Sequence, residues 1–484
     1  MYIERLKIAN LRSLEAVELE FNVPGGPGML YSNVNVLLGS NGRGKTSVLR
    51  AAALASLGAL LSSSSGYVPD ALIRRPQARR AVGRAALGKL PPAHMTASLQ
   101  LDPHELSGPK GKAGPTAVTL GTDVVMLGSS ERLRWHCHPA ALTGAVEKLQ
   151  FEERGSAFFI VGYGATRRVE ASARVDESAR VKSRLRRYER VSSLFEDHLG
   201  LMPLSYWLPA YAEANKGRYT QVLHLLDDLL PDNCRIQRSA TETDQGREHL
   251  FLMNGVPLPF RALSDGYRAY IGWIGDMLFH VCRGAGSGQK LRDLSGVVLL
   301  DEIDLHLHPD WQRSVLPTLA KALPQVQFIV TTHSPLVVGS LEGRNLFVLD
   351  DENGATVVKR LPERVHGRSA EQILLSPYFG LESTRAPEAA DKLKALSDKA
   401  ATGDTQASME YLALLSGGLS GNDLQQSRER AARDPGEATE PQPSTRRPDM
   451  DVVVETALKK IGSRKPKTPA KTPAKAPARR GPAK

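Results

Sequence analysis

The sequence predicts an α/β fold whose core is a parallel sheet, and three observations indicate it. Continuous apolar runs of strand length occur at Val34–Leu38, Gly296–Leu300 and Val326–Thr331, which is typical of strands buried on both faces of a sheet. Segments with the apolar spacing of helices lie between these runs, as crossovers between parallel strands require. The first run leads directly into a glycine-rich turn, so we expect a phosphate-binding loop at the end of that strand.

The amino-terminal part predicts two strands, at residues 1–9 and 14–21, because apolar residues of the second alternate with acids. After the glycine-rich turn, the spacing predicts one helix from about residue 45 to 61. We expect two further strands, at residues 95–101 and 158–163.

The middle of the chain has helical spacing between residues 189 and 230, where we expect Pro203, Pro209 and Pro231 to act as breaks. A further helix is predicted to follow Ser264.

The carboxyl-terminal half continues the alternation of helices and strands. A helix at residues 309–323 is expected to join the last two parallel strands. An Asn-Gly pair between residues 346–349 and 356–359 predicts a β-hairpin. Helical spacing returns from residue 369 to about 415.

These elements divide the chain into a head at residues 1–362 with an inserted helical lobe at about 175–260, a small helical region at 363–418, and a tail at 419–484. From Lys459 onward the tail holds ten Lys and Arg and no acid, spaced by Pro and Ala. Such a segment cannot bury a core, so we expect it to be disordered.

Most of the formal net charge of +11 comes from this tail. Without those ten residues the chain has 53 Lys and Arg against 52 Asp and Glu. Clustered basic residues attract phosphate backbones, so DNA is the expected partner of the tail. Two basic stretches of the body, at residues 74–84 and 167–190, are either solvated faces or a second phosphate-backbone surface.

We infer the cell compartment from three features that the sequence lacks: a membrane span, a signal peptide and clustered cysteines. No run approaches the roughly 20 apolar residues of a membrane span, and the amino terminus lacks the apolar region of a signal peptide. The three cysteines, Cys137, Cys234 and Cys282, are widely separated, which excludes a disulfide scaffold or a zinc ribbon. We expect a cytoplasmic protein with no membrane partner.

Residues 39–46 match the P-loop pattern at every fixed position. The glycines let backbone N–H groups surround phosphates, Lys45 can reach the β- and γ-phosphates, and Thr46 can bind Mg²⁺. The predicted nucleotide-binding residues of this loop are Gly39, Ser40, Asn41, Gly42, Arg43, Gly44, Lys45, Thr46 and Ser47.

Two acids, Asp301 and Glu302, end the predicted strand Gly296–Leu300. They should lie at the carboxyl edge of the sheet, where Asp301 can hold Mg²⁺ through water and Glu302 can accept a proton from an attacking water. Two acids can also simply end a buried strand, and the P-loop favours the catalytic interpretation.

Two further motifs surround these acids: Leu-Ser-Asp-Gly at residues 263–266 and Thr-Thr-His-Ser-Pro at residues 331–335. Ser264 precedes Asp301 by 37 residues and His333 follows it by 32. With the P-loop, this order and spacing resemble those of ABC-type ATPases of the SMC/RecF/OLD kind. Asp265 stands where transporter signatures usually have Gly, which argues against a transporter subunit.

A narrower resemblance rests on residues 300–312 followed by 326–335, and on residues 158–167 and 378–385. These segments look similar to predicted AAA-family ATPases of anti-phage defence systems of the Septu and retron types. It implies a sensor or regulatory ATPase that controls a nuclease or other effector. The alternative is a RecF/SMC-like ATPase of DNA repair or maintenance. No nuclease domain of this chain is expected after His333.

The ABC resemblance implies ATP and Mg²⁺ as cofactors and a homodimer or higher even oligomer. Catalytic roles then belong to Glu302, His333 and Lys45, with His333 at the γ-phosphate, and metal ligation to Thr46 and Asp301. The signature residues Ser264 and Gly266 would act on the ATP of the partner subunit. The glutamine of the family's Q-loop is not identified, and Gln100 is only a candidate.

Three other polar groups are interpreted as structural. His136 and His138 share one face of a predicted strand without a second ligand pair. His306 and His308 follow the two acids and are expected to shape the dimer contact. The acids at residues 350–352 precede an Asn-Gly pair and are interpreted as a hairpin tip.

Overall fold

The computed structural model describes residues 1–63, 67–75, 90–102, 106, 117–152, 157–167, 186–197, 199–243 and 246–415. The chain divides into one unit that ends at Thr384 and another that begins at Arg385. The predicted disordered tail at 419–484 lies outside the described residues, as does most of the two basic stretches at 74–84 and 167–190.

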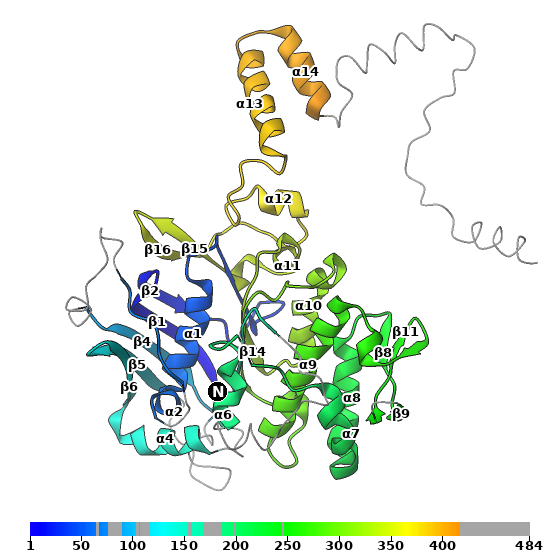
Figure 1. Ribbon diagram of the computed structural model, residues 1–484. Helices are drawn as coiled ribbons and strands as arrows, with labels where there is room; N and C mark the ends of the chain where they lie inside the picture. Colours follow the sequence, from blue (N-terminus) through cyan, green and yellow to red (C-terminus); the bar gives the residue numbers. More distant parts are fainter. Residues whose placement is uncertain are drawn as a thin grey trace, which may run out of the picture. The chain divides into compact units, whose positions relative to one another are not determined.

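A six-stranded sheet forms the centre of the first unit, in the order β16-β15-β3-β14-β13-β7 (Figure 1). All neighbouring pairs are parallel except β15 and β16, which form the predicted hairpin. The α/β prediction is therefore confirmed, and three strands have the predicted bounds. The strands are β3 (Val34–Leu38), β7 (Ile160–Tyr163), β13 (Gly296–Leu300), β14 (Val326–Thr331), β15 (Leu346–Glu352) and β16 (Ala355–Lys359).

Strands β3, β13 and β14 of this sheet are buried on both faces, which explains why their sequences are mainly apolar. On one face, Val298 and Phe328 join a core with helices α8 (Lys216–Leu229), α9 (Asp265–Gly284) and α10 (Pro309–Ala322). On the other face, Val297 and Ile329 join a second core that includes helix α1 (Lys45–Ser56) and an antiparallel sheet. Figure 1 shows α1 and that sheet on one side and α8, α9 and α10 on the other.

The antiparallel sheet has the order β2-β1-β4-β5-β6. The buried amide of Gln327 on β14 joins it to the central sheet, since Gln327 accepts from Ile3 N at 2.8 Å and donates to Ile3 O at 2.8 Å. The prediction covered β1, β2, β4 and the end of β6, but it missed β5. The strands are β1 (Tyr2–Leu11), β2 (Leu14–Glu20), β4 (Ala93–Gln100), β5 (Ala117–Leu127) and β6 (Ser130–His138).

The single helix predicted at residues 45–61 is wrong in one respect, because the chain forms α1 and then a separate helix, α2 (Gly58–Ser62). A Cβ atom on Gly58 would lie 2.2 Å from Thr122 Oγ1 and 2.9 Å from Trp135 Cβ. The break at Leu57 therefore brings the backbone of Gly58 directly against β5 and β6.

The segment predicted as a helical lobe, residues 175–260, is only partly helical. Its described part begins with α6 (Arg186–Ser192), α7 (Leu204–Ala214) and α8. The predicted break at Pro209 is wrong, because Pro209 lies inside α7, whose Leu204, Trp207 and Leu208 are buried. Five short strands follow: β8 (Cys234–Ile236), β9 (Thr241–Thr243), β10 (Gly246–Glu248), β11 (Phe251–Met253) and β12 (Val256–Leu258).

Short helices complete the first unit: α4 (Thr143–Phe151), α11 (Pro335–Gly339) and α12 (Ala370–Leu374). This unit extends to Thr384, beyond the head boundary expected at residue 362. The described part of the second unit is a pair of helices, α13 (Pro387–Ala401) and α14 (Thr405–Leu415), in the region expected to be helical. Among the described helices, none is both long and apolar enough to cross a membrane.

Candidate functional site

The glycine-rich turn between β3 and α1 has a backbone that requires glycine. Gly39, Gly42 and Gly44 all have positive φ angles, of 140°, 82° and 90°. A Cβ atom on Gly39 would lie 2.4 Å from Leu349 O of β15, and one on Gly44 would lie 2.7 Å from Leu14 Cδ2. The loop is thus held between the hairpin of one sheet and a turn of the other.

Lys45 is buried at the start of α1, with 7% of its surface exposed. Its Nζ donates to Gly39 O at 2.7 Å and to Ser40 O at 3.2 Å, so the ammonium group lies within the loop. Burial lowers the pKa of Lys45, and the nearby carboxylates of Asp301 and Glu302 oppose that shift. A phosphate group bound in the loop would meet a desolvated ammonium group and a helix amino terminus.

The two acids lie at the carboxyl end of β13, close to the P-loop. Asp301 Oδ2 accepts a 2.7 Å hydrogen bond from Thr46 Oγ1, and its Oδ1 accepts one of 2.6 Å from Thr331 Oγ1. Glu302 has a φ angle of 49°, which is unusual for a residue other than glycine. The Glu302 N–H donates to Thr331 Oγ1 at 2.7 Å.

The donor set at this point fits Mg²⁺. A hydroxyl and a carboxylate lie side by side at the P-loop, and Mg²⁺ prefers oxygen ligands, of which one or two come from the protein and others from substrate phosphates. Among the described residues, no three His, Cys, Asp or Glu side chains form a cluster that could hold a metal ion by themselves.

A cavity of about 420 Å³ brings the separate motifs together. Its lining comes from the β1–β2 turn, the P-loop, the end of β13 and the segment after β14. The lining residues are Arg12, Ser13, Asn41, Gly42, Gly44, Lys45, Thr46, Ser47, Asp301, Glu302 and His333. The structure thus brings the predicted P-loop, acids and histidine into one site, while their chemical roles stay predictions.

His333 reaches the cavity from the loop between β14 and α11. Its N–H donates to Asp304 Oδ1 at 3.3 Å, and Thr332 Oγ1 donates to the same atom at 2.5 Å. Asp304 therefore fixes the backbone that carries His333, a role that the sequence analysis did not assign. Its position as a third acid within three residues of Asp301 was the available signal.

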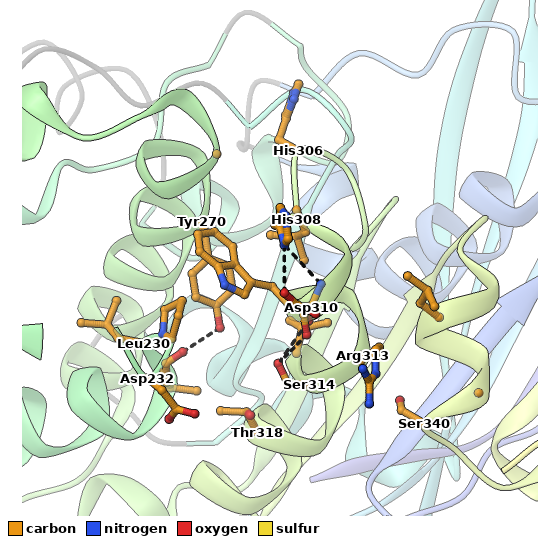
Figure 2. Close-up of a pocket in the computed structure, with 18 of the residues that line it drawn as sticks. Leu230, Asp232, Tyr270, His306, His308, Asp310, Arg313, Ser314, Thr318 and Ser340 are labelled. Atoms are coloured by element: carbon orange, nitrogen blue, oxygen red, sulfur yellow. Dashed lines mark hydrogen bonds and ion pairs between the residues drawn. The ribbon is translucent and has the colours of Figure 1, made fainter. Parts of the chain in front are cut away.

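The signature residues lie elsewhere. In the described part of the chain, neither Ser264 nor Gly266 lines the P-loop cavity. Both line a larger cleft of about 1590 Å³, together with His306 and His308 (Figure 2). Side chains from α9, α10 and the segment after α8 converge on this cleft, and a Cβ atom on Gly266 would lie 3.0 Å from His306 O.

Aromatic rings of α9 and α10 form part of the cleft wall. The ring centroids of Tyr267 and Trp311 are 4.3 Å apart, and those of Tyr270 and Trp311 are 5.8 Å apart. Figure 2 shows Tyr270 on this wall and Arg313 farther along α10. Such rings provide a large contact area at little cost in side-chain entropy, as protein interfaces often use.

Two arginines at the site were not among the predicted site residues. Arg12 lines the P-loop cavity from the β1–β2 turn, where it has a φ angle of 50°, and burial lowers its pKa. Arg167 follows β7 and donates to the backbone carbonyls of both acids. In the sequence, Arg167 belongs to a basic stretch for which we expect either a solvated face or a phosphate-backbone surface.

That interpretation of the second basic stretch is wrong for its described buried members. Arg187 has 2% and Arg190 has 4% of its surface exposed. Arg187 donates to the carbonyls of Ala157 and Phe158, and the guanidinium of Arg190 lies 5.2 Å from the ring centroid of Phe159. These side chains pack inside the unit because β7 begins directly beside them.

The remaining candidates have structural surroundings. Gln100 is exposed at the end of β4, paired with Tyr2, and among the described residues it is not part of the cavity lining. The acids at 350–352 are at the hairpin tip, as predicted, where Asp351 forms an ion pair with Arg43 of the P-loop.

Comparison with known proteins adds a family and relatives. Residues 148–339 match the family described as "AAA domain, putative AbiEii toxin, Type IV TA system". The Septu protein PtuA of Bacillus mycoides (strain KBAB4) is 25% identical over 386 residues, which is 79% of this chain and 45% of that protein. The Retron Ec83 probable ATPase of Escherichia coli is 32% identical over 193 residues, which is 38% of this chain and 33% of that protein.

The chain thus spans less than half the length of these relatives. Among solved structures, an SmcHead bound to the C-winged helix domain of ScpA is similar with a TM-score of 0.44 and 16% identity, over 75% of this chain and 98% of that one.

Proposed function

We propose that the chain carries an ABC-type ATPase domain and that it binds and hydrolyses ATP as a homodimeric switch. The match of residues 148–339 to an AAA domain family and the similarity to the Septu and retron ATPases support this proposal. The observation that supports this most directly is the single cavity that unites Lys45, Thr46, Asp301, Glu302 and His333. These residues come from three distant segments of the chain, and together they supply the groups that phosphoryl transfer needs.

Binding of the triphosphate would use the P-loop. Lys45 supplies a buried positive charge, and the amino terminus of α1 adds backbone N–H groups. Thr46 and Asp301 would hold Mg²⁺, which, when bound, neutralises charge on the β- and γ-phosphates. The 2.7 Å contact between their side chains supports this assignment.

Glu302 is the proposed general base. It lines the same cavity as Lys45, one residue beyond the proposed metal ligand. Its carboxylate would accept a proton from the attacking water while the water oxygen forms a bond to the γ-phosphorus. The bond between that phosphorus and the bridging oxygen breaks, and ADP leaves. His333 would contact the γ-phosphate from the loop between β14 and α11.

The position of the signature supports the proposed dimerisation. In the described residues, Ser264 and Gly266 line a cleft other than the P-loop cavity of their own chain. They could therefore act on ATP only when a second copy presents them. A two-fold pair of heads would complete two sites at once, so that ATP joins the heads and hydrolysis releases them.

The biological role we favour is that of the sensing or regulatory ATPase of an anti-phage system, which controls a separate nuclease. The similarity to Septu PtuA and to the Retron Ec83 probable ATPase supports this choice. A RecF/SMC-like role in DNA repair is the second candidate, and the basic residues from Lys459 to Lys484 favour it.

The direct test is nucleotide binding and phosphate release by the purified full-length chain. Changing Lys45 to Ala should abolish ATP binding and therefore phosphate release. The matched control is Lys321→Ala, which removes an exposed lysine of α10 and should leave both unchanged. ATP binding by Lys45→Ala at the affinity of the unmodified chain would contradict the proposed site.

A further inference from the structure

Arg167, which lies outside the P-loop, binds the backbone of both acids. Its guanidinium donates through Nη1 to Asp301 O at 2.7 Å and through Nη2 to Glu302 O at 2.8 Å. One planar side chain thus binds the carbonyls on both sides of a single Cα atom, that of Glu302. Two parallel N–H donors in a rigid fork are the feature that distinguishes arginine from lysine.

The backbone that Arg167 binds is in an unfavourable conformation. Glu302 has a φ angle of 49°, in the left-handed region that disfavours residues with a Cβ atom. Its N–H is held from the other side by Thr331 Oγ1 at 2.7 Å, and the next N–H, of Ile303, by Thr331 O at 3.0 Å. The conformation therefore depends on partners outside the β13 segment.

The chain before Arg167 is shaped to deliver the side chain. Gly164 follows β7, and a Cβ atom there would lie 2.4 Å from Ser193 O, so only glycine fits this approach. Arg167 N then donates to Ala165 O at 3.1 Å, which forms a tight turn toward β13. Burial lowers the pKa of Arg167 to about 10, opposed by Asp301, so the guanidinium stays protonated at neutral pH.

We propose that Arg167 is a positioning residue that fixes the carboxylate of Glu302 toward the attacking water by binding the carbonyl oxygens of residues 301 and 302. The proposal rests on the ATP hydrolysis proposed above. In the described residues Arg167 does not line the P-loop cavity, so it acts through Glu302 and not on the nucleotide. Its loss should therefore affect turnover and leave ATP affinity unchanged.

The test uses the full-length chain with Arg167→Ala and Arg167→Lys. A fluorescent ATP analogue measures the affinity for nucleotide and the number of nucleotide-binding sites. The rate of phosphate release, divided by that number, gives kcat per site. We expect Arg167→Ala to lower kcat per site at least tenfold, with Kd and KM within twofold. Arg167→Lys should be intermediate, because an ammonium group cannot donate as a planar fork.

Two comparisons separate positioning from a general loss of structure. Arg218→Ala also removes a guanidinium from backbone carbonyls, those of Cys282, Ala285 and Gly286, and should leave kcat per site within twofold. The double variant Arg167→Ala with Glu302→Gln should have the residual rate of Glu302→Gln alone, because Arg167 acts through that carboxylate.

Three results would overturn the proposal: an unchanged kcat per site in Arg167→Ala, a tenfold weaker Kd, or additive losses in the double variant. If Arg167→Ala fails to fold, Arg167→Lys decides, since kcat per site equal to that of the unmodified chain contradicts the need for the fork. Failure of the proposed function is recognised separately, because the unmodified chain itself would then release no phosphate from ATP.

Discussion

Thr46 Oγ1 donates a 2.7 Å hydrogen bond to Asp301 Oδ2 across 255 residues of sequence. Thr46 is the last residue of the P-loop pattern and lies in the first turn of α1, and Asp301 directly follows β13. The sheet order β3-β14-β13 brings these two ends together, with β14 between them. The contact is thus a consequence of the parallel topology, and it supports the metal position proposed above.

Asp301→Asn tests that location. The amide keeps the size of the side chain and can still accept from Thr46, but it removes the charge that would hold Mg²⁺. We expect Mg²⁺-stimulated phosphate release to fall about 100-fold or more, as expected for loss of a charged transition-state contact. Asp293→Asn, at an exposed aspartate, is the control. Unchanged stimulation by Mg²⁺ in Asp301→Asn would contradict the assignment.

Subunit mixing tests whether the signature acts on the partner's ATP. Lys45→Ala and Ser264→Arg should each be inactive alone, since one lacks a phosphate contact and the other blocks the signature. Random mixing in equal amounts should restore about one quarter of the activity, because half of the dimers are mixed and each has one complete site.

The control mixes Lys45→Ala with a chain that carries both changes. Every site then lacks Lys45, so no activity should return. Absence of recovery in the first mixture, with mixed dimers demonstrated by differently tagged chains, would count against the proposed pairing.

Removal of the residues from Lys459 onward tests the proposed DNA contact. Ten basic residues without an acid should bind DNA through counterion release, so full-length affinity should fall steeply with salt, and truncation should reduce both affinity and slope. Basal ATP hydrolysis should persist, because both described apolar cores are built from residues before 380. If affinity and salt slope survive truncation, any DNA contact lies on the rest of the chain.

Because His249 is buried, we expect the free energy of unfolding to fall in acid. Burial, with a smaller effect of the charge on Arg247, lowers the pKa of His249 to about 4. Among the described residues its Nδ1 is buried without a hydrogen-bond partner, while Nε2 lies 2.7 Å from the Tyr219 hydroxyl. In the unfolded chain a histidine binds a proton near pH 6.5, so the unfolded state gains this proton first as the pH falls. The free energy of unfolding therefore decreases between pH 6.5 and pH 4.

The size of this effect is about 2 kcal/mol at pH 5, from 1.36 kcal/mol for each pH unit. It can be measured by urea unfolding at pH 7 and pH 5 for the unmodified chain and for His249→Gln. The variant should lose less stability between the two pH values. Equal losses in both chains would show that His249 is not the titrating group.

The parts of the fold that the sequence predicted well are those with a local cause. Strands Val34–Leu38 and Gly296–Leu300 are covered on both faces, so their apolar runs have clear ends. The hairpin at residues 346–359 follows from its Asn-Gly pair. The P-loop glycines reflect a backbone that no other residue adopts as readily.

The errors have causes that are distant in the sequence. The break before Gly58 depends on close contact with Thr122 and Trp135, more than 60 residues away. Pro209 stays inside α7 because burial of Trp207 and Leu208 outweighs one lost backbone hydrogen bond. Arg167 resembled a member of a solvated charge run, and only the parallel pairing of β7 with β13 brings it to the acids.

The proposed ATP hydrolysis depends on Glu302, which would remove a proton from the attacking water, and Glu302→Gln tests this role without changing the size of the side chain. The amide cannot accept that proton, whereas the contacts of Lys45 and Thr46 with the nucleotide would remain. The measurement is single-turnover conversion of bound ATP to ADP, with the mass of the complex followed by light scattering. The account predicts that Glu302→Gln binds ATP, accumulates as a dimer and forms ADP at least 100-fold more slowly than the unmodified chain. ADP formation by Glu302→Gln at the unmodified rate would contradict it.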